Sequence, residues 1–315
     1  MKSPSKTVKV YAPASIGNVC AGFDVLGVAI DAPGDIVIAK RTQAPGLTFT
    51  VKQTTSIVPT NNQNIAAHVA QLILDECHPS FGIDLTLYKN MPIGSGLGSS
   101  GASSAAAAVA ANALLTKPLP KQALLAFTVE GERLASGTAH ADNVAPSLLG
   151  GLCLIQHYQP LNVIKVPIKN IFYWVVVHPH IIIETKMARG LLPTSLPTAT
   201  TTEQFGYLGG LIVGLMKGDA KLVSQSLHDT IAEPTRSTLI PEFNTIKAAA
   251  IHAGALGFSI SGSGPSVFAL TDSLKTAQQV ALTIKQTFLH AAKINSDTYI
   301  SKINQRGTHI LETSV

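Results

Sequence analysis

The sequence predicts an α+β fold divided into two domains. A length of 315 residues suggests two domains, at about 150 residues for each. Segments with strand and helix patterns are mixed along the chain rather than strictly alternating, which favours α+β over a doubly wound parallel sheet. Hydrophobic residues make up 46% and charged residues 13% of the chain. A chain of this length and composition can bury a large core without a disulfide framework.

The individual elements follow from the spacing of apolar residues. Segments 7–11 and 83–88 alternate apolar and polar residues, as half-buried strands do. Segment 62–77 repeats apolar residues at helical spacing, and the alanine-rich run 102–116 suits a helix packed closely on all sides. The expected strands are 7–11, 35–39, 47–51, 83–88, 150–156, 171–177, 256–261, 266–270 and 298–300. The expected helices are 62–77, 102–116, 121–136, 241–253 and 272–290, with helical pieces in 203–231.

The least regular stretch is 185–202, which is rich in proline, threonine and leucine. We therefore expect a boundary or a hinge loop near 160–200. This gives an N-terminal domain over 1–165 and a C-terminal domain over 166–315.

Composition and charge exclude several classes of protein. The three cysteines match no zinc or CxxC spacing, and so few cysteines are typical of a reducing cytoplasm, the expected location. No stretch of about 18 residues is continuously apolar, so no membrane-spanning helix is expected. The polar start runs directly into a strand, so no signal peptide is expected either. The 23 basic residues are scattered, so nucleic acid is not an expected partner.

A glycine-rich loop, PIGSGLGSSG at 92–101, is the strongest local motif. Glycines let backbone N–H groups approach an anion closely. The helix that follows adds its unpaired N–H groups and the positive end of its dipole. We expect Ser99 and Ser100 at the cap, where a hydroxyl can bind phosphate or Mg²⁺. The plain alternative is a glycine-rich turn into a capped helix.

Two common nucleotide-binding motifs fit this loop poorly. Segment 96–101 matches GxGxxG, but the dinucleotide motif needs an acidic residue about 20 positions later. Position 118 is proline, and the first acidic residue after the loop is Glu130. No Gly-Lys-Ser/Thr follows the glycines, so the loop is not a Walker A motif. A dehydrogenase is therefore only a remote alternative.

The loop and two further segments together resemble the motifs of the GHMP kinases, the family of galactose, homoserine, mevalonate and phosphomevalonate kinases. The three are YAPASIGNVCAGFDVLG at 11–27, PIGSGLGSSGASS at 92–104 and GFSISGSGPSVFA at 257–269. The match is closest to the branch that acts on homoserine, through AHADNVAPSLLGG at 139–151, TKMARGLLP at 185–193 and DTIAEPTRSTLIPEF at 229–243. The chain departs from the family at 19–21, where Val-Cys-Ala replaces Leu-Gly-Pro, and at Gly101, where alanine is usual. We expect Cys20 to be a small buried residue rather than a nucleophile.

The resemblance implies a fold, a reaction and an assembly. The implied fold has an N-terminal domain like ribosomal S5 domain 2, with a left-handed βαβ unit, and a ferredoxin-like C-terminal domain. The implied reaction is phosphoryl transfer from ATP, with Mg²⁺, to the side-chain hydroxyl of L-homoserine, a step towards threonine. Members of the family are often homodimers. Another small-molecule kinase of the family, or a non-catalytic metabolite sensor on the same fold, is the alternative.

The resemblance also assigns the phosphate site. Ser100 and Glu132 are the implied Mg²⁺ ligands, since one hydroxyl and one carboxylate commonly hold this ion. Glu132 falls in the C-terminal half of its helix, where a carboxylate opposes the helix dipole, and Glu130 is the alternative ligand. The implied ATP-binding residues are Pro92, Ile93, Gly94, Ser95, Gly96, Leu97, Gly98, Ser99, Ser100, Gly101 and Ala102.

Homoserine is a small zwitterion, and its recognition needs a cation for the carboxylate and an acceptor for the ammonium. Arg189 and Arg236 lie in matching motifs, and arginine binds carboxylates through two parallel hydrogen bonds. By resemblance, Asn18, Asp24, His140, Asn143 and Thr185 complete the substrate site. Asp142 is the positional candidate for a general base. We favour orientation of the hydroxyl by Asn143, because a loose phosphoryl-transfer transition state requires little activation of the nucleophile.

Overall fold

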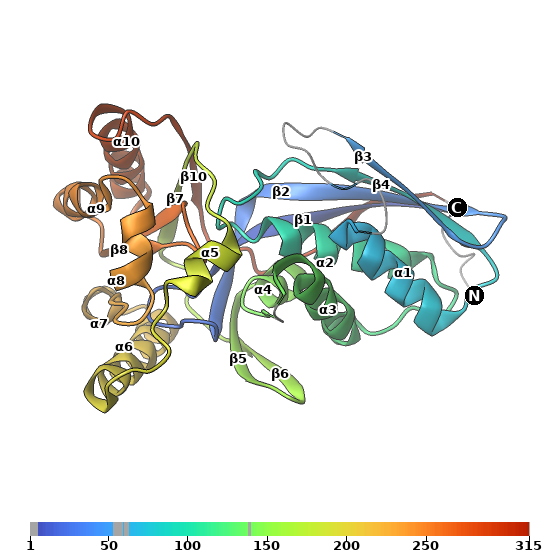
Figure 1. Ribbon diagram of the computed structural model, residues 1–315, viewed down its shortest axis with the longest axis horizontal. Coiled ribbons are helices and arrows are strands. Elements are labelled where there is room, and N and C mark those ends of the chain that lie inside the picture. Colours follow the sequence, from blue (N-terminus) through green and yellow to red (C-terminus); the bar gives the residue numbers. More distant parts are fainter. Residues whose placement is uncertain (1–5, 53–58, 60–62, 138–139, 315) are drawn as a thin grey trace.

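The computed structural model describes residues 6–52, 59, 63–137 and 140–314, which form two sheets flanked by helices (Figure 1). Asn62, where a helix was expected to start, and Ala139, the first residue of a matching motif, lie outside the described residues. Helices and strands are mixed along the chain, so the predicted α+β class is confirmed.

The first sheet has seven strands in the order β11-β1-β2-β4-β3, and β5 pairs with both β2 and β6. The long strand β2 organises this sheet, because its first residues pair with β5 and its last residues pair with β4. Strands β3 and β4 are parallel and are joined through α1. The bounds are β1 (Thr7–Gly17), β2 (Leu26–Thr42), β3 (Leu47–Lys52), β4 (Gly82–Tyr88), β5 (Leu152–Tyr158), β6 (Leu161–Val166) and β11 (His309–Ser314).

Helices α1 to α4 lie together against one side of this sheet (Figure 1). Helix α2 packs on β1 and β2, and 12 of its 16 residues are buried. Small side chains make this possible, because they let a helix approach its neighbours on all sides, as predicted. The bounds are α1 (Ile65–Cys77), α2 (Ser99–Leu114), η1 (Lys121–Ala123), α3 (Leu124–Ser136) and α4 (Val144–Leu149).

The second sheet has four antiparallel strands in the order β10-β7-β9-β8. Numbered along the chain, this order is 4-1-3-2, and helices precede β8 and β10, as in the expected ferredoxin-like arrangement. The strands are β7 (Tyr173–Pro179), β8 (Gly257–Ile260), β9 (Val267–Thr271) and β10 (Ser296–Ser301). The helices are α5 (Thr185–Gly190), α6 (Thr198–Lys217), α7 (Ala220–Ser226), α8 (Glu233–Arg236), η2 (Ser237–Leu239), α9 (Phe243–His252) and α10 (Leu274–His290).

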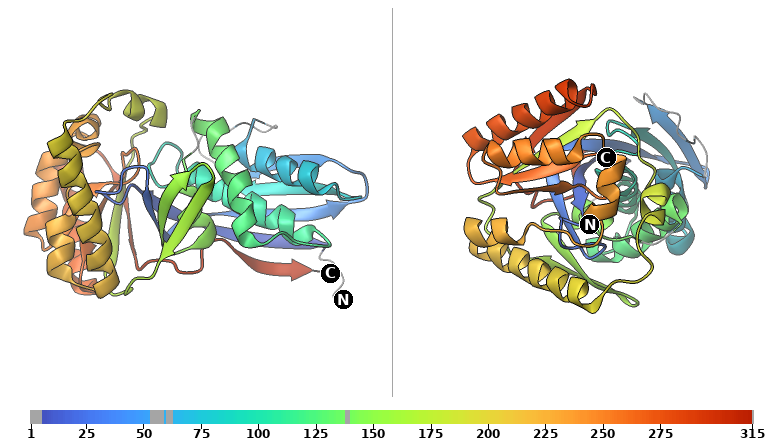
Figure 2. Two further views of the ribbon diagram at one scale, coloured as in Figure 1. Left: turned by 90° about the horizontal axis from the view of Figure 1, so that it is seen from below. Right: turned by 60° about the vertical axis from the view of Figure 1, so that its left-hand side comes forward.

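Both faces of the second sheet are covered (Figure 2). Because successive side chains of a strand point to opposite faces, Val175 and Val177 share a core with α9 and α10. Trp174 and Val176 instead belong to the core that contains Leu211 and continues into the first sheet. The two parts of the chain are therefore packed against each other.

The division at 165/166 remains a proposal. Strand β6 ends at Val166 and β7 begins at Tyr173, while β11 returns from the end of the described chain to pair with β1. Strands β6 and β11 and helices α4, α5 and α8 were not predicted from the sequence, and α5 lies within the stretch 185–202 that was expected to be irregular. Within the described ranges, no helix combines the length and apolar character required to cross a membrane.

Candidate active site

The glycine-rich loop joins β4 to α2, as predicted, but α2 begins three residues earlier than expected, at Ser99. The cap is Gly98 rather than a serine, and no side chain caps the helix. Gly94, Gly96 and Gly98 all have positive φ, at 63°, 76° and 66°, a conformation that glycine adopts without strain. The first turn of α2 thus has no side-chain cap, and Gly98 and Ser99 line the cavity described below, which suits an anion site.

A second glycine loop, at 262–265, packs against the first. The Ser261 hydroxyl donates to the carbonyl of Gly96 at 2.7 Å, and the Ser266 N–H donates to the carbonyl of Ser95 at 3.1 Å. A Cβ on Gly96 would come within 2.4 Å of the Ser261 carbonyl oxygen. Only glycine fits at this contact, so the two loops are held in one arrangement.

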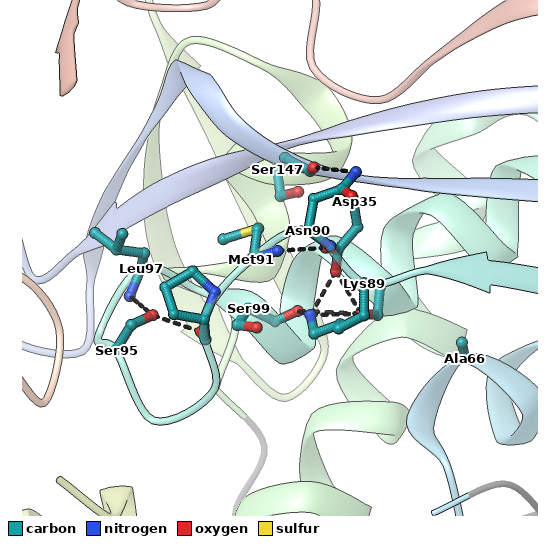
Figure 3. Close-up of polar contacts among 12 residues, drawn as sticks. Asp35, Ala66, Lys89, Asn90, Met91, Ser95, Leu97, Ser99 and Ser147 are labelled. Carbon is teal, nitrogen blue, oxygen red and sulfur yellow. Dashed lines mark hydrogen bonds and ion pairs between the residues drawn. The ribbon is translucent and has the colours of Figure 1, made fainter. Parts of the chain in front are cut away.

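A buried lysine that was not predicted as a site residue lies next to the first residue of α2 (Figure 3). Lys89 Nζ donates to the carbonyl of Ser99 at 2.8 Å and pairs with the carboxylate of Asp35. The other Asp35 oxygen accepts the backbone N–H groups of Asn90 and Met91, each at 3.0 Å. The pair thus joins β2, the start of the loop and the first turn of α2. The acidic partner is 54 positions away in sequence, so no local motif could reveal it.

Breaking this buried pair is expected to destabilise the protein strongly. The Lys89→Met variant should lose about 3–5 kcal/mol of unfolding free energy, because it leaves the fully buried Asp35 carboxylate without its cation. Urea unfolding measures the loss, and adding Asp35→Asn should recover part of it. The control is Lys9→Met, which removes the exposed pair with Glu312 and should cost about 1 kcal/mol or less. Equal losses in both variants would contradict the expectation.

The two predicted metal ligands, Ser100 and Glu132, lie side by side. Helix α3 presents Glu132, which is 7% exposed, and its carboxylate hydrogen-bonds to the Ser100 side chain. Burial raises the pKa of Glu132 to about 7, and the hydrogen bond from Ser100 opposes this rise. Glu130, the alternative, forms a surface ion pair with Arg133 at 2.6 Å. The structure therefore favours Glu132 as the carboxylate next to the phosphate loop.

Asp142 and Asn143 lie between the phosphate loop and the turn that follows β1. The Asn18 N–H donates to Asp142 Oδ2 at 3.1 Å, and the Ser15 hydroxyl donates to Asn143 Oδ1 at 3.0 Å. Burial, with a further contribution from Asp24, raises the pKa of Asp142 to about 7. A Cβ on Gly98 would come within 3.0 Å of Asn143 Oδ1. The Asn143 amide is thus in contact with the residue that caps α2.

The turn that carries the next site residue has an uncommon backbone. Asn18, Val19 and Cys20 have positive φ values of 66°, 43° and 63°, and Asp24 has a φ of 59°. For residues other than glycine this conformation costs roughly 1–2 kcal/mol each, and such strain gathers at functional sites. Cys20 is 1% exposed, so the prediction that it is buried is confirmed, and burial raises the pKa of its thiol.

Asp24 contacts both a predicted arginine, Arg189, and the predicted histidine, His140. Arg189 Nη2 donates to both oxygens of Asp24, at 2.7 and 2.9 Å, and His140 Nδ1 lies 3.8 Å from Asp24 Oδ1. Burial is the main cause that lowers the pKa of His140. Arg236 is 3% exposed and donates from Nη1 to the carbonyl of Gly262 at 2.9 Å. The buried Nε atoms of Arg189 and Arg236 have no hydrogen-bond partner among the described residues.

One polar cavity brings most of the predicted residues together. Its lining includes parts of both glycine loops, and Thr185 and Ser263 lie at one wall with their hydroxyl oxygens 3.4 Å apart. The lining residues are Asn18, Asp24, Gly94, Ser95, Gly96, Gly98, Ser99, Glu132, His140, Asp142, Asn143, Thr185, Arg189, Arg236, Gly262 and Ser263. Six of the predicted loop residues do not line this cavity: Pro92, Ile93, Leu97, Ser100, Gly101 and Ala102, of which Leu97, Gly101 and Ala102 are buried.

A neighbouring hollow, which was not predicted from the sequence, adjoins the phosphate loop. It shares Gly94 and Ser99 with the polar cavity and adds Ser100 and Lys89. Its apolar lining consists of Pro59, Ile65, Leu87, Ile93 and Leu134, with Gln63 and Asn64 at its polar side. Ser100 faces this hollow while its partner Glu132 faces the polar cavity, so the hydrogen-bonded pair lies between the two spaces.

Comparison with known proteins identifies the family. The models for the GHMP kinases N terminal domain and the GHMP kinases C terminal domain match residues 64–151 and 211–290. The chain is 45% identical to homoserine kinase from Chlorobaculum tepidum, over 98% of this chain and 99% of the relative. The chain belongs to the GHMP kinase family. It is therefore a kinase that uses ATP, and the dehydrogenase alternative is wrong.

Solved structures agree with this assignment. The crystal structure of homoserine kinase from Cytophaga hutchinsonii is 43% identical to this GHMP kinase, with a TM-score of 0.95 and coverage of 99% of both chains. The L. major mevalonate kinase in complex with R-mevalonate has a TM-score of 0.69 at 16% identity, covering 98% of this chain and 99% of that one. This second likeness concerns the fold alone.

Proposed function

We propose that this kinase transfers the γ-phosphoryl group of ATP, with Mg²⁺, to the side-chain hydroxyl of L-homoserine, giving O-phospho-L-homoserine. One observation carries the proposal. Two arginines, each with a buried Nε–H that has no partner among the described residues, line the same cavity as the first turn of a phosphate-binding helix. Such a cavity suits a substrate that has a carboxylate at one end and a phosphoryl acceptor at the other. The homoserine kinases among the relatives support the choice of homoserine.

The charges of the cavity match a zwitterion. The guanidinium groups of Arg189 and Arg236 offer fixed donors to the substrate carboxylate, and the carboxylate of Asp24 offers an acceptor to the ammonium. Without substrate, Asp24 is the counter-ion of Arg189. An amino acid supplies one charge of each sign and leaves both protein groups partnered. His140, Asn18 and Thr185 complete the wall around it.

The phosphates of ATP are proposed to lie along the loop 92–98 at the N-terminus of α2. The neighbouring hollow fits the nucleoside, because its apolar lining opens beside the same loop and is continuous with it through Gly94 and Ser99. The reacting phosphoryl group would then point from the hollow towards the polar cavity.

Ser100 and Glu132 fit Mg²⁺, because a hydroxyl and a carboxylate are hard oxygen donors and lie together between the two spaces. A bound Mg²⁺ neutralises charge on the phosphates. Glu132 would bind it as the carboxylate, because a nearby cation favours the ionised form of a group whose pKa burial raises.

Asn143 is proposed to orient the substrate hydroxyl, and Asp142 to hold the turn after β1 through the Asn18 N–H. The Asp142→Asn variant tests this division. It should keep at least a tenth of the wild-type kcat, because an amide oxygen can still accept from Asn18. A loss of about 1,000-fold, in the middle of the 10²–10⁴-fold range of proton-transfer catalysis, would make Asp142 the general base.

The same variant carries a pH signature in stability. The folded protein holds a proton on Asp142 up to about pH 7, whereas the unfolded chain releases it near pH 4. The contribution of Asp142 to stability is therefore present at low pH and is lost as pH rises through 7. Relative to wild type, Asp142→Asn should gain about 2 kcal/mol of unfolding free energy between pH 5 and pH 8. Denaturant unfolding at both pH values measures this, and a pH-independent difference would contradict the raised pKa.

The function is tested by ADP release with Mg·ATP and a panel of L-homoserine, L-threonine, mevalonate and galactose. Turnover with homoserine alone supports the proposal. Turnover with another alcohol would support the role of the phosphate loop but contradict the role of the two arginines as a carboxylate clamp. ATP binding without turnover of any compound would favour a metabolite sensor. The cytoplasmic location and the homodimer stay predictions.

A further inference from the structure

Phe23 contacts both arginines of the cavity. Its ring centroid lies 5.5 Å from Arg189 Cζ and 5.2 Å from Arg236 Cζ. A guanidinium within about 6 Å of an aromatic centroid is attracted by the negative face of the ring. Among the described residues that line the polar cavity, Phe23 itself is absent. The ring therefore contacts two residues that line the cavity, but it does not line the cavity itself.

The two guanidinium groups carry like charges that repel each other, and an aromatic ring can offset part of this repulsion. Asp24 gives both of its oxygens to Arg189, whereas Arg236 hydrogen-bonds to the neutral carbonyl of Gly262. Burial lowers the pKa of Arg236, and the charge of Arg189 lowers it further. A second carboxylate would relieve the repulsion but would occupy N–H groups. The Phe23 ring attracts both cations and leaves their donors for a ligand.

The ring also connects its own segment to two others. Phe23 lies in the turn after β1, Arg189 in α5 and Arg236 in α8. The turn is firmly held, because the Asp24 N–H donates to Asn18 Oδ1 at 3.0 Å and Gln204 Nε2 donates to the Ala21 carbonyl at 2.8 Å. A ring fixed in this turn sets where each guanidinium lies relative to the other.

We propose that Phe23 is a positioning residue that holds Arg189 and Arg236 at the spacing needed to bind one substrate carboxylate together, and so favours carboxylate-bearing alcohols. This inference rests on the proposed function. It extends the site by a residue that acts only through the two arginines.

The test compares wild type with Phe23→Leu in steady-state kinetics with L-homoserine. Loss of two ring–cation contacts should raise KM for homoserine about tenfold. The kcat should stay within about twofold and KM for ATP should not change, because the phosphate loop is untouched. The inhibition constant of 3-aminopropan-1-ol, which is homoserine without its carboxylate, should also stay within about twofold. Phe23→Tyr keeps an aromatic ring and should retain the wild-type KM for homoserine.

Phe81→Leu is the matched control, since the Phe81 ring lies 4.0 Å from Arg41 Cζ, away from the cavity. It should leave KM for homoserine unchanged. If Phe23→Leu fails to fold, as shown by its thermal unfolding, Phe23→Met replaces it with an unbranched, flexible side chain that adapts to irregular gaps in a core and has no ring. An unchanged KM for homoserine in a folded variant overturns the proposal, as does an equal weakening of 3-aminopropan-1-ol. Wild type that does not turn over homoserine overturns the proposed function instead.

Discussion

Glu132→Gln is expected to lower kcat about 100-fold or more while the protein still folds. The substitution keeps the shape of the side chain and removes its charge, and phosphoryl transfer depends on positioning and charge neutralisation. A 100-fold loss is about 2.7 kcal/mol of transition-state stabilisation. Ser100→Ala, which removes the hydroxyl hydrogen-bonded to Glu132, should also lower kcat strongly. Steady-state assays over a range of Mg²⁺ concentrations measure both effects.

Glu130→Gln is the control for this prediction. Glu130 lies on the same helix, two positions earlier, but pairs with Arg133 at the surface. Its replacement should leave kcat unchanged. Wild-type kcat in both Ser100→Ala and Glu132→Gln would refute the Mg²⁺ assignment. An equal loss in Glu130→Gln would trace the effect to helix α3 rather than to the buried carboxylate.

Removing either arginine of the cavity should weaken homoserine binding by about 1.5–3 kcal/mol, the range for hydrogen bonds to charged groups. This corresponds to a rise in KM of about 10- to 100-fold for Arg189→Met and for Arg236→Met. Methionine keeps an unbranched side chain of similar reach but has no donors. KM for ATP should be little changed, because neither arginine lines the neighbouring hollow.

The kinetic comparison includes Arg133→Met, which removes an exposed arginine outside both spaces. This control should leave both KM values at the wild-type level. A KM for homoserine that stays within twofold in both cavity variants would remove the carboxylate clamp from the proposed function. The same result with altered KM for ATP would assign the arginines to the nucleotide instead.

Features that depend on neighbouring residues could be predicted from the sequence. The phosphate loop has its own glycine pattern, and the elements with clear apolar periodicity, such as α1, β4 and α10, lie where they were expected. The start of α2 was misplaced, because two serines resembled a cap. The glycine before them takes that position through a left-handed φ of 66°, which the sequence pattern did not distinguish.

Features that depend on distant residues could not be predicted. In the sequence, Lys89 is simply a charged residue that follows a strand. Its role becomes visible only in the fold, where it pairs with Asp35 of another strand. Phe23 acquires a role only when two arginines more than 160 positions later come to its ring. Strand β11 is almost entirely exposed after its first residue, so it shows no alternation of buried and exposed positions. Its pairing with β1 alone makes it a strand.

The pairing of β11 with β1 has a consequence for how the protein is made. Residues 7–11 leave the ribosome about 300 positions before their partners at 309–314. During synthesis one edge of β1 therefore presents unpaired backbone groups, and such an edge can recruit strands of other chains. Loop closure over about 300 residues is also a late event in folding. The first sheet can reach its final form only after translation of the second is complete.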